Sequence, residues 1–458
     1  MAKKIIFAAL LLTLLPAVAL ATVSEGWERH VIGDQTSPIY LYVADMDGDG
    51  NLDVVTTTNV HPGIYDSEVA WYQNNLKVGG EWKKIIISSN APGSDVITNA
   101  NGVVVADIDN DGRPDVVVGT GRAGTVYWFK APANPEQENW QRFQVEPSND
   151  EAFYKMYTMD VNNDGKQDII AGTKQGTYVY RNPGTPAEGA AQWQKTLIAA
   201  GTGYSNYLAD MDCDGKMDII NSHMGSKEDG YKGNISWVDV VYTKGVVSFN
   251  RTMIDDNLFK SFDVNTMDVN SDRRTDVLVS IFQTPGLYWY EAPAKTSDPW
   301  AKHTISDTFE GTDLYTGDIN GDGRKEMIIS GLFTNKISWF EPTADDTLWT
   351  EHVLDDDILL PGDISLNDMD GDGDLDVVLA GMGENQIIWY ENKIPQQNTC
   401  VVTYLLGKNS AALPKLRDVR DAYLKSTSAG QLIIKAYYTC SPGIVKLLQS
   451  LQGSADWF

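Results

Sequence analysis

One short acidic motif recurs seven times along this chain and restricts the possible folds more than any other feature. Its last copy reads DMDGDGDLD, from Asp368 to Asp376. A near-constant spacing, here 62, 53, 50, 58, 50 and 50 residues, is typical of chains built from one repeated supersecondary unit. The seven copies start at Asp45, Asp107, Asp160, Asp210, Asp268, Asp318 and Asp368.

The motif carries the residue types that bind a hard cation. Oxygen side chains stand at positions 1, 3, 5 and 9, which suits calcium because this ion takes about six to eight oxygen ligands. Position 6 is Gly in six copies and permits a sharp turn at positive φ. Thr56 and Val118 stand at position 12, where an EF-hand needs a bidentate Glu, and a β-branched run follows the motif. The motif therefore predicts a loop that opens a strand and binds calcium, up to seven ions in all.

The predicted ligands are the side chains at positions 1, 3, 5 and 9 and the backbone carbonyl at position 7. They are Asp45, Asp47, Asp49, Asn51, Asp53, Asp107, Asp109, Asp111, Arg113, Asp115, Asp160, Asn162, Asp164, Lys166, Asp168, Asp210, Asp212, Asp214, Lys216, Asp218, Asp268, Asn270, Asp272, Arg274, Asp276, Asp318, Asn320, Asp322, Arg324, Glu326, Asp368, Asp370, Asp372, Asp374 and Asp376. The site at Asp268 is doubtful because Arg273 replaces the Gly. The alternative is a hairpin held by its own Asp side chains without a metal.

Two further patterns accompany each acidic motif. One is a strand that begins with Trp, as in Trp27–Ile32 and Trp140–Val145, and the other holds a pair of large residues, as in Trp389-Tyr390. With the strands before and after the acidic loop, each repeat has four strands, so the chain is expected to be all-β and to form a seven-bladed β-propeller. A solenoid is the second possibility. Because the first Trp strand precedes every other strand, it is expected to pair with the last blade and close the ring.

These motifs resemble the FG-GAP/VCBS repeats of secreted proteins and of integrin-type propellers. The resemblance covers about residues 27–393. It implies that each acidic loop binds calcium and stabilises its blade, and it leaves the function of the whole protein open.

The two ends of the chain differ from the repeats. Lys3 and Lys4 precede an apolar run that ends at Ala19 and Ala21, so residues 1–21 are interpreted as a secretory signal. The propeller is assigned to residues 22–395, and the protein is expected to be secreted, periplasmic or at the cell surface. No other stretch has the length and hydrophobicity of a membrane span.

Residues 396–458 lack the acidic motif and are predicted to form a small helical module. Its segment from Leu416 to Leu424 and the pair Tyr437-Tyr438 resemble the CFI-box module of secreted bacterial proteins. Export would permit a disulfide between Cys400 and Cys440. A helical cap on the propeller is the alternative.

The acidic loops also account for much of the charge. The formal net charge is −27, and 25 of the 63 acidic residues stand at positions 1, 3, 5 and 9 of the motif. Since no basic patch is present, a nucleic-acid partner is not expected.

The rim opposite the acidic loops is the predicted ligand surface. The loops Thr57–Glu68 and Ser222–Lys232 reach that rim and hold His61 and His223, whereas the other histidines share one position of the Trp strand and are interpreted as structural. Carboxylates and aromatic rings precede several acidic motifs by five or six residues, a combination that suits sugars. The predicted ligand residues are Tyr40, Tyr154, Tyr204, Phe262, Asp263, Asp313, Asp363, His61 and His223. The alternative is that these residues cap strands and pack between blades.

No catalytic signature such as Gly-x-Ser-x-Gly or His-Glu-x-x-His occurs, so a non-enzymatic role is favoured. The first hypothesis is a secreted, calcium-binding adhesion or binding module for a glycan or an extracellular protein. The second is a polysaccharide lyase or hydrolase that uses Asp263, Asp313 and Asp363, the three aspartates expected to face the central channel, with His61 or His223. The third is a structural component of an extracellular assembly, attached through residues 396–458.

Overall fold

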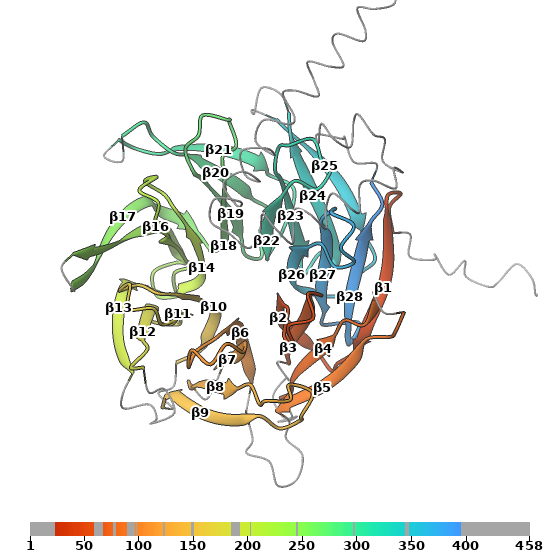
Figure 1. Cartoon of the computed structure of the whole chain (residues 1–458). Coiled ribbons are helices and arrows are strands. Elements are labelled where there is room, and N and C mark those ends of the chain that lie inside the picture. Colours follow the sequence, from red (N-terminus) through yellow and green to blue (C-terminus); the bar gives the residue numbers. More distant parts are fainter. Residues whose placement is uncertain are drawn as a thin grey trace, which may run out of the picture.

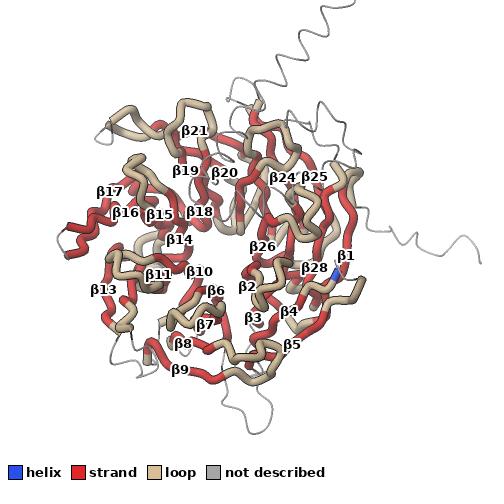
Figure 2. The backbone as a smooth tube through the Cα atoms, viewed as in Figure 1, coloured by secondary structure: helices blue, strands red, loops and turns tan. Residues whose placement is uncertain are grey.

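The structure is a computed structural model that describes residues 23–394, except 59–66, 77–78, 89–96, 98, 122–123, 148–150, 185–192, 202, 244–245, 296–297 and 344–347. The predicted signal sequence, the module at 396–458 with Cys400 and Cys440, and His61 lie outside the described residues. The described backbone consists of strands and the loops between them, without an α-helix; the small blue mark in Figure 2 is a short 3₁₀ turn at Leu76.

The strands have the following bounds: β1 (Trp27–Asp34), β2 (Pro38–Ala44), β3 (Asp53–Thr58), β4 (Val69–Gln73), β5 (Lys83–Ser88), β6 (Ala100–Ala106), β7 (Asp115–Thr120), β8 (Val126–Lys130), β9 (Gln141–Glu146), β10 (Phe153–Met159), β11 (Asp168–Thr173), β12 (Gly176–Arg181), β13 (Gln194–Ala200), β14 (Gly203–Ala209), β15 (Asp218–His223), β16 (Lys232–Thr243), β17 (Val246–Phe259), β18 (Ser261–Met267), β19 (Asp276–Ile281), β20 (Leu287–Glu291), β21 (Ala301–Ser306), β22 (Leu314–Gly317), β23 (Glu326–Gly331), β24 (Lys336–Pro342), β25 (Trp349–Asp355), β26 (Pro361–Asn367), β27 (Asp376–Gly381) and β28 (Gln386–Asn392).

These strands form seven four-stranded antiparallel sheets arranged as blades around a central axis (Figure 1). Blade 1 is β2–β5, blade 2 is β6–β9, blade 3 is β10–β13, blade 4 is β14–β17, blade 5 is β18–β21, blade 6 is β22–β25, and blade 7 combines β26–β28 with β1. The first strand of each blade lies next to the axis. The predicted seven-bladed propeller is therefore confirmed.

The first strand of the chain closes the ring, as its sequence position predicted. β1 pairs antiparallel with β28, from Trp27 opposite Asn392 to Asp34 opposite Gln386. The amide of Ser24 also donates to the carbonyl of Leu354 in blade 6, at 2.9 Å. This pairing covers the outer edge of blade 7, which would otherwise expose unpaired backbone groups.

The strand that follows each acidic loop forms the buried centre of its blade. All six residues of β3, DVVTTT, are buried, and the same holds for the equivalent strand of every other blade. Such a strand has a neighbouring strand on each side and packed side chains on both faces. β-branched residues suit this environment because their restricted rotamers pack well on a pleated surface.

The Trp that begins the outer strand seals each blade to the preceding one. Trp140 of blade 2 packs against Trp71, Ile85 and Ile87 of blade 1. Equivalent contacts join Trp193 to blade 2, Phe249 to blade 3, Trp300 to blade 4, Trp349 to blade 5, Trp27 to blade 6 and Trp82 to blade 7. The Trp pattern of the sequence therefore marks the seams between blades.

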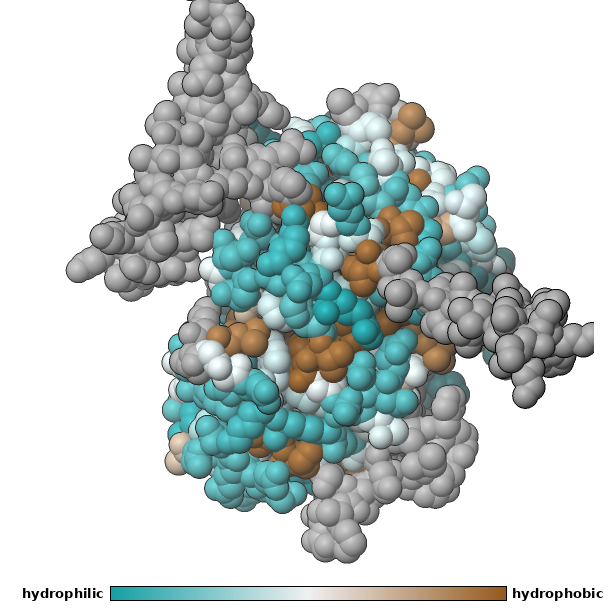
Figure 3. Space-filling model, turned by 90° about the vertical axis from the view of Figure 1, so that its right-hand side faces the viewer, coloured by the Kyte–Doolittle hydropathy of each residue, from teal (hydrophilic) through white to brown (hydrophobic). Residues whose placement is uncertain are grey.

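The outside of the propeller on the side of β1 is mostly hydrophilic, with small separate hydrophobic patches (Figure 3).

Candidate functional sites

The acidic loops share one hydrogen-bonding geometry in all seven blades. In each loop the amide of position 6 donates to Oδ2 of the Asp at position 1, at 2.7 to 3.0 Å. In blade 5 this donor is the amide of Arg273, which adopts the positive φ of 68° that glycine has elsewhere. That conformation costs a non-glycine residue about 1–2 kcal/mol. The loop at Asp268 thus keeps the shape of the other six despite its Arg.

Position 9 ties each loop to the end of the third strand. Oδ2 of Asp53 accepts from the amide of Met46 at 3.0 Å, and its Oδ1 accepts from the amide of Asn74 at 2.7 Å. Burial raises the pKa of Asp53 to about 7 and that of Asp376 likewise to about 7. A cation at the loop would offset this cost of holding a buried carboxylate ionised.

Blade 6 departs from this arrangement in two linked ways. Position 9 is Glu326, and the residue that would donate the second amide is Pro342, which has no N–H. Oε2 of Glu326 accepts from the amide of Ile319 at 2.7 Å, while its Oε1 is buried without a hydrogen-bond partner. The longer side chain therefore has an oxygen that the backbone does not use.

The loops fit the predicted cation. In the loops that start at Asp45, Asp107, Asp210 and Asp318, three carboxylates lie with their oxygens within 4.8 Å of one another. Oδ1 of Asp109 and Oδ1 of Asp318 are buried without a hydrogen-bond partner, like Oε1 of Glu326. Buried polar atoms are usually satisfied, and converging unsatisfied oxygens are the donor set that calcium takes.

The acidic loops also lie at one common rim. Nδ2 of Asn110 in the blade 2 loop donates to the carbonyl of Gly165 in the blade 3 loop at 3.1 Å. Oγ1 of Thr275 in the blade 5 loop donates to the carbonyl of Asp210 in the blade 4 loop, also at 3.1 Å. The loops between second and third strands lie at the opposite rim, as the antiparallel connectivity predicts.

The three predicted channel aspartates do come together, but around a lysine. Nζ of Lys155 lies 2.7 Å from Oδ2 of Asp263, 3.3 Å from Oδ1 of Asp313 and 3.8 Å from Oδ1 of Asp363. Lys155 stands five residues before its acidic motif, the same position as the three aspartates. The sequence analysis did not single out Lys155, although a comparison of the equivalent position in every blade would have identified it. These positions are Tyr40, Gly102, Lys155, Ser205, Asp263, Asp313 and Asp363.

This axial cluster is buried and bound to the backbone of the inner strands. Asp263 is 1% exposed and Asp363 is 4% exposed. Oδ2 of Asp263 accepts from the amide of Leu314 at 2.9 Å, and Oδ2 of Asp363 accepts from the amide of Leu41 at 3.3 Å. Each aspartate thus links its inner strand to a neighbouring one. The geometry agrees with the packing alternative for these residues.

The charges of the axial cluster do not balance if every group is ionised. Burial raises the pKa of Asp363 to about 8, although Lys155 lowers it, and burial also raises the pKa of Asp313. Burial lowers the pKa of Lys155, but the attraction of Asp263 and the other acidic groups outweighs this effect and raises it. Lys155 therefore stays charged, and the excess carboxylate favours a bound proton.

The predicted aromatic residues form a continuous stack beside the axis. The ring centroids of Tyr154 and Tyr204 lie 4.4 Å apart, and those of Tyr204 and Phe262 lie 4.0 Å apart. Phe282 stacks on Phe262 at 4.8 Å, and Phe333 meets Phe282 edge-on at 5.6 Å. Phe282 and Phe333 lie in loops between second and third strands, where no strand pattern singled them out.

The stack reaches the surface at the rim opposite the acidic loops. Phe333 is 48% exposed, and Phe259, which ends β17 on the same rim, is 47% exposed. Nζ of Lys260 lies 5.0 Å from the ring centre of Tyr231 and 6.0 Å from that of Phe282. We call this cluster the aromatic rim. It consists of the exposed Phe259 and Phe333, the partly exposed Tyr154, Tyr204, Tyr231, Lys260 and Phe282, and the buried Phe262.

Two other predicted ligand residues lie elsewhere. Tyr40 is buried beside the axial cluster. His223 does not lie in a rim loop, because it is the last residue of β15 and is 1% exposed. Burial, with the nearby guanidinium of Arg251, lowers the pKa of His223 to about 3. His223 is therefore a neutral residue inside blade 4.

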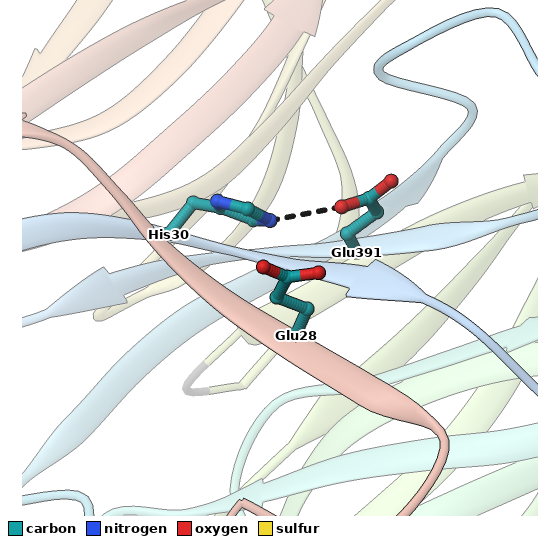
Figure 4. Close-up of side chains that lie close together, drawn as sticks. All are labelled: Glu28, His30 and Glu391. Atoms are coloured by element: carbon teal, nitrogen blue, oxygen red, sulfur yellow. Dashed lines mark hydrogen bonds and ion pairs between the residues drawn. The ribbon is translucent and has the colours of Figure 1, made fainter.

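The three remaining described histidines share one structural role, as predicted. His30 stacks on Trp389 at 4.5 Å between ring centres, and its Nε2 lies 2.9 Å from Oε2 of Glu391, beside Glu28 (Figure 4). The same arrangement joins His303 to Trp289 and Glu291, and His352 to Trp339 and Glu341.

A cavity of about 760 Å³ opens at the seam between blades 4 and 5. Trp237 and Trp300 line it together with Asp212, Asp239 and Asp298. Asp212 belongs to the acidic loop of blade 4, so this cavity adjoins the loop rim rather than the aromatic rim. No sequence pattern indicated this cavity, because its walls come from separate blades.

A family model described as FG-GAP-like repeat matches residues 45–118, 160–220 and 268–329. The chain contains FG-GAP-like repeats. Each matched segment begins at the acidic motif of one blade and ends in the strand that leaves the acidic loop of the next blade, so it covers two of the loops described above. No curated protein matches the chain.

Several solved structures are similar in fold. A lectin from Agrocybe aegerita that recognises non-reducing terminal N-acetylglucosamine has 16% identity and a TM-score of 0.48, over 79% of this chain and 87% of its own. A chain of the COPII outer coat vertex on membranes has 10% identity and a TM-score of 0.49, over 78% and 84%. The rhamnogalacturonan lyase YesW has 14% identity and a TM-score of 0.44, over 82% and 75%. Among the described residues of this chain, no helix has the length and hydrophobicity of a membrane crossing.

Proposed function

We propose that this protein is a secreted, calcium-stabilised binding module that holds a glycan or an extracellular protein on its aromatic rim. The observation that carries the proposal is the stack of rings from Tyr154 to Phe333, which ends at the exposed Phe333, with the exposed Phe259 on the same rim. Monomeric proteins rarely expose apolar groups together unless the surface binds something.

The chemistry of the rim suits a ligand with apolar faces and polar edges. Aromatic rings offer large apolar contact area, and tyrosine adds a hydroxyl that needs a hydrogen-bond partner. Lys260 supplies a cation beside Tyr231 and Phe259. Leu359, 47% exposed in the loop between β25 and β26, continues the apolar surface on the same rim. A sugar ring or an aromatic-rich peptide would match this combination.

Calcium has a structural part in this proposal. Ions at positions 1, 3, 5, 7 and 9 of the acidic loops would neutralise clustered carboxylates and fix the strands on either side. Extracellular modules commonly bind calcium with dissociation constants of about 10⁻⁴ to 10⁻³ M, which suits the export expected from residues 1–21. In this proposal the loop rim is the scaffold, and the ligand binds at the opposite rim.

The enzymatic alternative loses its expected site. It required Asp263, Asp313 and Asp363 to reach a substrate together with His61 or His223. Two of these aspartates are buried with Lys155 between them, and His223 lies inside blade 4. No observation on the described residues favours catalysis there.

A ligand screen with a matched pair of variants tests the proposal. The mature protein, residues 22–458, is applied to a glycan array and to extracellular protein extracts in calcium. Phe259→Ala combined with Phe333→Ala should weaken any binding at least about tenfold, which corresponds to about 1.4 kcal/mol. Leu348→Ala is the control, because Leu348 is 65% exposed in the loop between β24 and β25 at the acidic-loop rim. Ligand binding that survives the double variant unchanged would place the site elsewhere.

A further inference from the structure

One position of the third strand lies beside each acidic loop. It directly follows the pair of large residues in the third strand, such as Trp389-Tyr390, and we call it the flanking position. Nε2 of Gln73 donates to Oδ2 of Asp47 at 2.6 Å, and Nδ2 of Asn270 donates to Oε1 of Glu291 at 3.2 Å. The flanking residues are Gln73, Lys130, Arg181, Asp239, Glu291, Glu341 and Glu391.

In blade 2 the flanking residue is a cation that already occupies the carboxylates. Nζ of Lys130 bonds to Oδ2 of Asp109 and lies 2.8 Å from Oδ2 of Asp111. These two aspartates are positions 3 and 5 of the loop, two of the predicted calcium ligands. Arg113 also bonds to Asp111. Basic residues at position 7 also bond to the position 5 aspartate in blades 3, 4 and 5, as Lys166 does to Asp164, Lys216 to Asp214 and Arg274 to Asp272. Lys130 differs from them because its ammonium contacts the carboxylates of both position 3 and position 5.

In blades 5 and 6 the flanking residue has the opposite sign. Position 3 is Asn270 in blade 5 and Asn320 in blade 6, so each loop lacks one carboxylate. Glu291 accepts from Asn270, and Glu341 accepts from Asn320 at 3.5 Å. The third strand thus brings a carboxylate to each site. In blade 5 the guanidinium of Arg274 offsets this charge, because it bonds to Asp272 and lies 3.9 Å from Oε1 of Glu291.

We propose that the flanking residue ranks the acidic loops for calcium: Lys130 acts as a built-in cation that makes the blade 2 loop the weakest site, whereas Glu341 strengthens blade 6. This inference rests on the proposed calcium binding. It follows because a fixed ammonium repels a divalent ion and competes for its oxygens, and an added carboxylate attracts it. Arg181, the flanking residue of blade 3, forms no ion pair with its own loop among the described residues. Lys130 is therefore the flanking cation that occupies loop carboxylates.

Two reciprocal substitutions test the role of Lys130. Lys130→Gln gives blade 2 the flanking residue of blade 1, and Gln73→Lys gives blade 1 the flanking residue of blade 2. Calcium ions are counted by native mass spectrometry of the mature protein at one fixed micromolar free calcium, and isothermal titration gives the affinities. Lys130→Gln should hold one ion more than the unaltered protein, and Gln73→Lys one ion fewer.

The outcomes separate this inference from the calcium proposal. Equal ion numbers and equal affinities in the unaltered protein and Lys130→Gln would overturn the ranking while leaving calcium binding intact. An absence of bound calcium in every variant would overturn both. Should Gln73→Lys fail to fold, the comparison of Lys130→Gln with the unaltered protein decides alone.

A second pair of variants tests the carboxylates. Glu341→Gln should weaken one site about tenfold in calcium titration, because it removes a charge beside Asn320. Glu384→Gln removes the same charge from the loop between β27 and β28 at the opposite rim and should change no site more than about twofold. Equal effects of the two substitutions would show that only the overall charge matters and would contradict a ligand role for Glu341.

Discussion

Lys155 reaches across the propeller axis and donates its ammonium to Asp263, with 2.7 Å between Nζ and Oδ2. The two residues belong to β10 of blade 3 and β18 of blade 5, which are not neighbours in the ring. The same ammonium lies near Asp313 of blade 6 and Asp363 of blade 7. One side chain thus joins opposite parts of the ring, and this contact makes the axis a packed centre.

Replacing Lys155 by Met should strongly destabilise the protein. The substitution leaves three carboxylates close together without their cation, and removing one partner of a buried pair costs about 3–5 kcal/mol. The midpoint of urea denaturation, followed by Trp fluorescence, measures the loss. Lys336→Met is the control, because Lys336 pairs with Glu351 at the surface and such pairs contribute about 1 kcal/mol or less. Similar losses in both variants would contradict the central role of Lys155.

The axial cluster should make stability fall as the pH rises. The folded-state pKa of Asp363 is about 8, raised by burial, whereas an unfolded Asp titrates near 3.9. Between these values the folded chain holds a proton that the unfolded chain releases, so the free energy of unfolding decreases with pH, by up to about 1.4 kcal/mol per pH unit. Denaturation in saturating calcium from pH 5 to pH 8 measures the slope.

Asp363→Asn provides the comparison for this pH dependence. The amide keeps the shape of the side chain and cannot ionise, so the slope between pH 5 and pH 8 should become flatter. A slope equal to that of the unaltered protein would show that the proton resides on another group, such as Asp313.

Removing calcium should lower the melting temperature by about 10 °C or more. A site at a hundredfold excess of ligand over its dissociation constant adds about 2.7 kcal/mol, and several loops would act together. Thermal unfolding of the mature protein with calcium and with chelator gives the shift. If chelator has no effect, metal analysis of the same sample separates loops that never held an ion from loops that were not stripped.

Trp140→Ala should open the seam between blades 1 and 2. The side chain is buried against Trp71 and Ile85, and truncating such a residue costs about 3–5 kcal/mol. Leu348→Ala, at an exposed position, should change stability by less than about 0.5 kcal/mol. A denaturation midpoint for Trp140→Ala as high as that of the control would mean that the seam does not depend on the tryptophan.

Much of the fold could be predicted because its units are local in sequence. The loop from Asp45 to Asp53 joins two strands that are hydrogen-bonded neighbours, and the same unit recurs in every blade. The order of strand types also predicted that Trp27 would pair with the last blade. The channel aspartates were found for the same reason, since Asp263, Asp313 and Asp363 share one position relative to their motifs.

The partners of these residues could not be predicted. Lys155 was overlooked because residue type, rather than position, selected the three aspartates. Phe282 and Phe333 lie in loops without any periodic pattern, and only their spacing from Phe262 reveals the stack. His223 does not lie in the predicted rim loop, because β15 extends two residues into the segment Ser222–Lys232 that was assigned to that loop.

The sequence by itself determined the repeat, the four-stranded blade, the closure by the first strand and the predicted calcium ligands. These features depend on contacts within one repeat or on the order of repeats, both of which are written along the chain. Only the tertiary structure decided that Lys155 pairs with the three aspartates at the axis, that Lys130 occupies the loop of blade 2 and that the aromatic rings meet at one rim. Each of these contacts joins strands or blades whose separation depends on the curvature of the whole ring. A local sequence pattern does not predict that curvature.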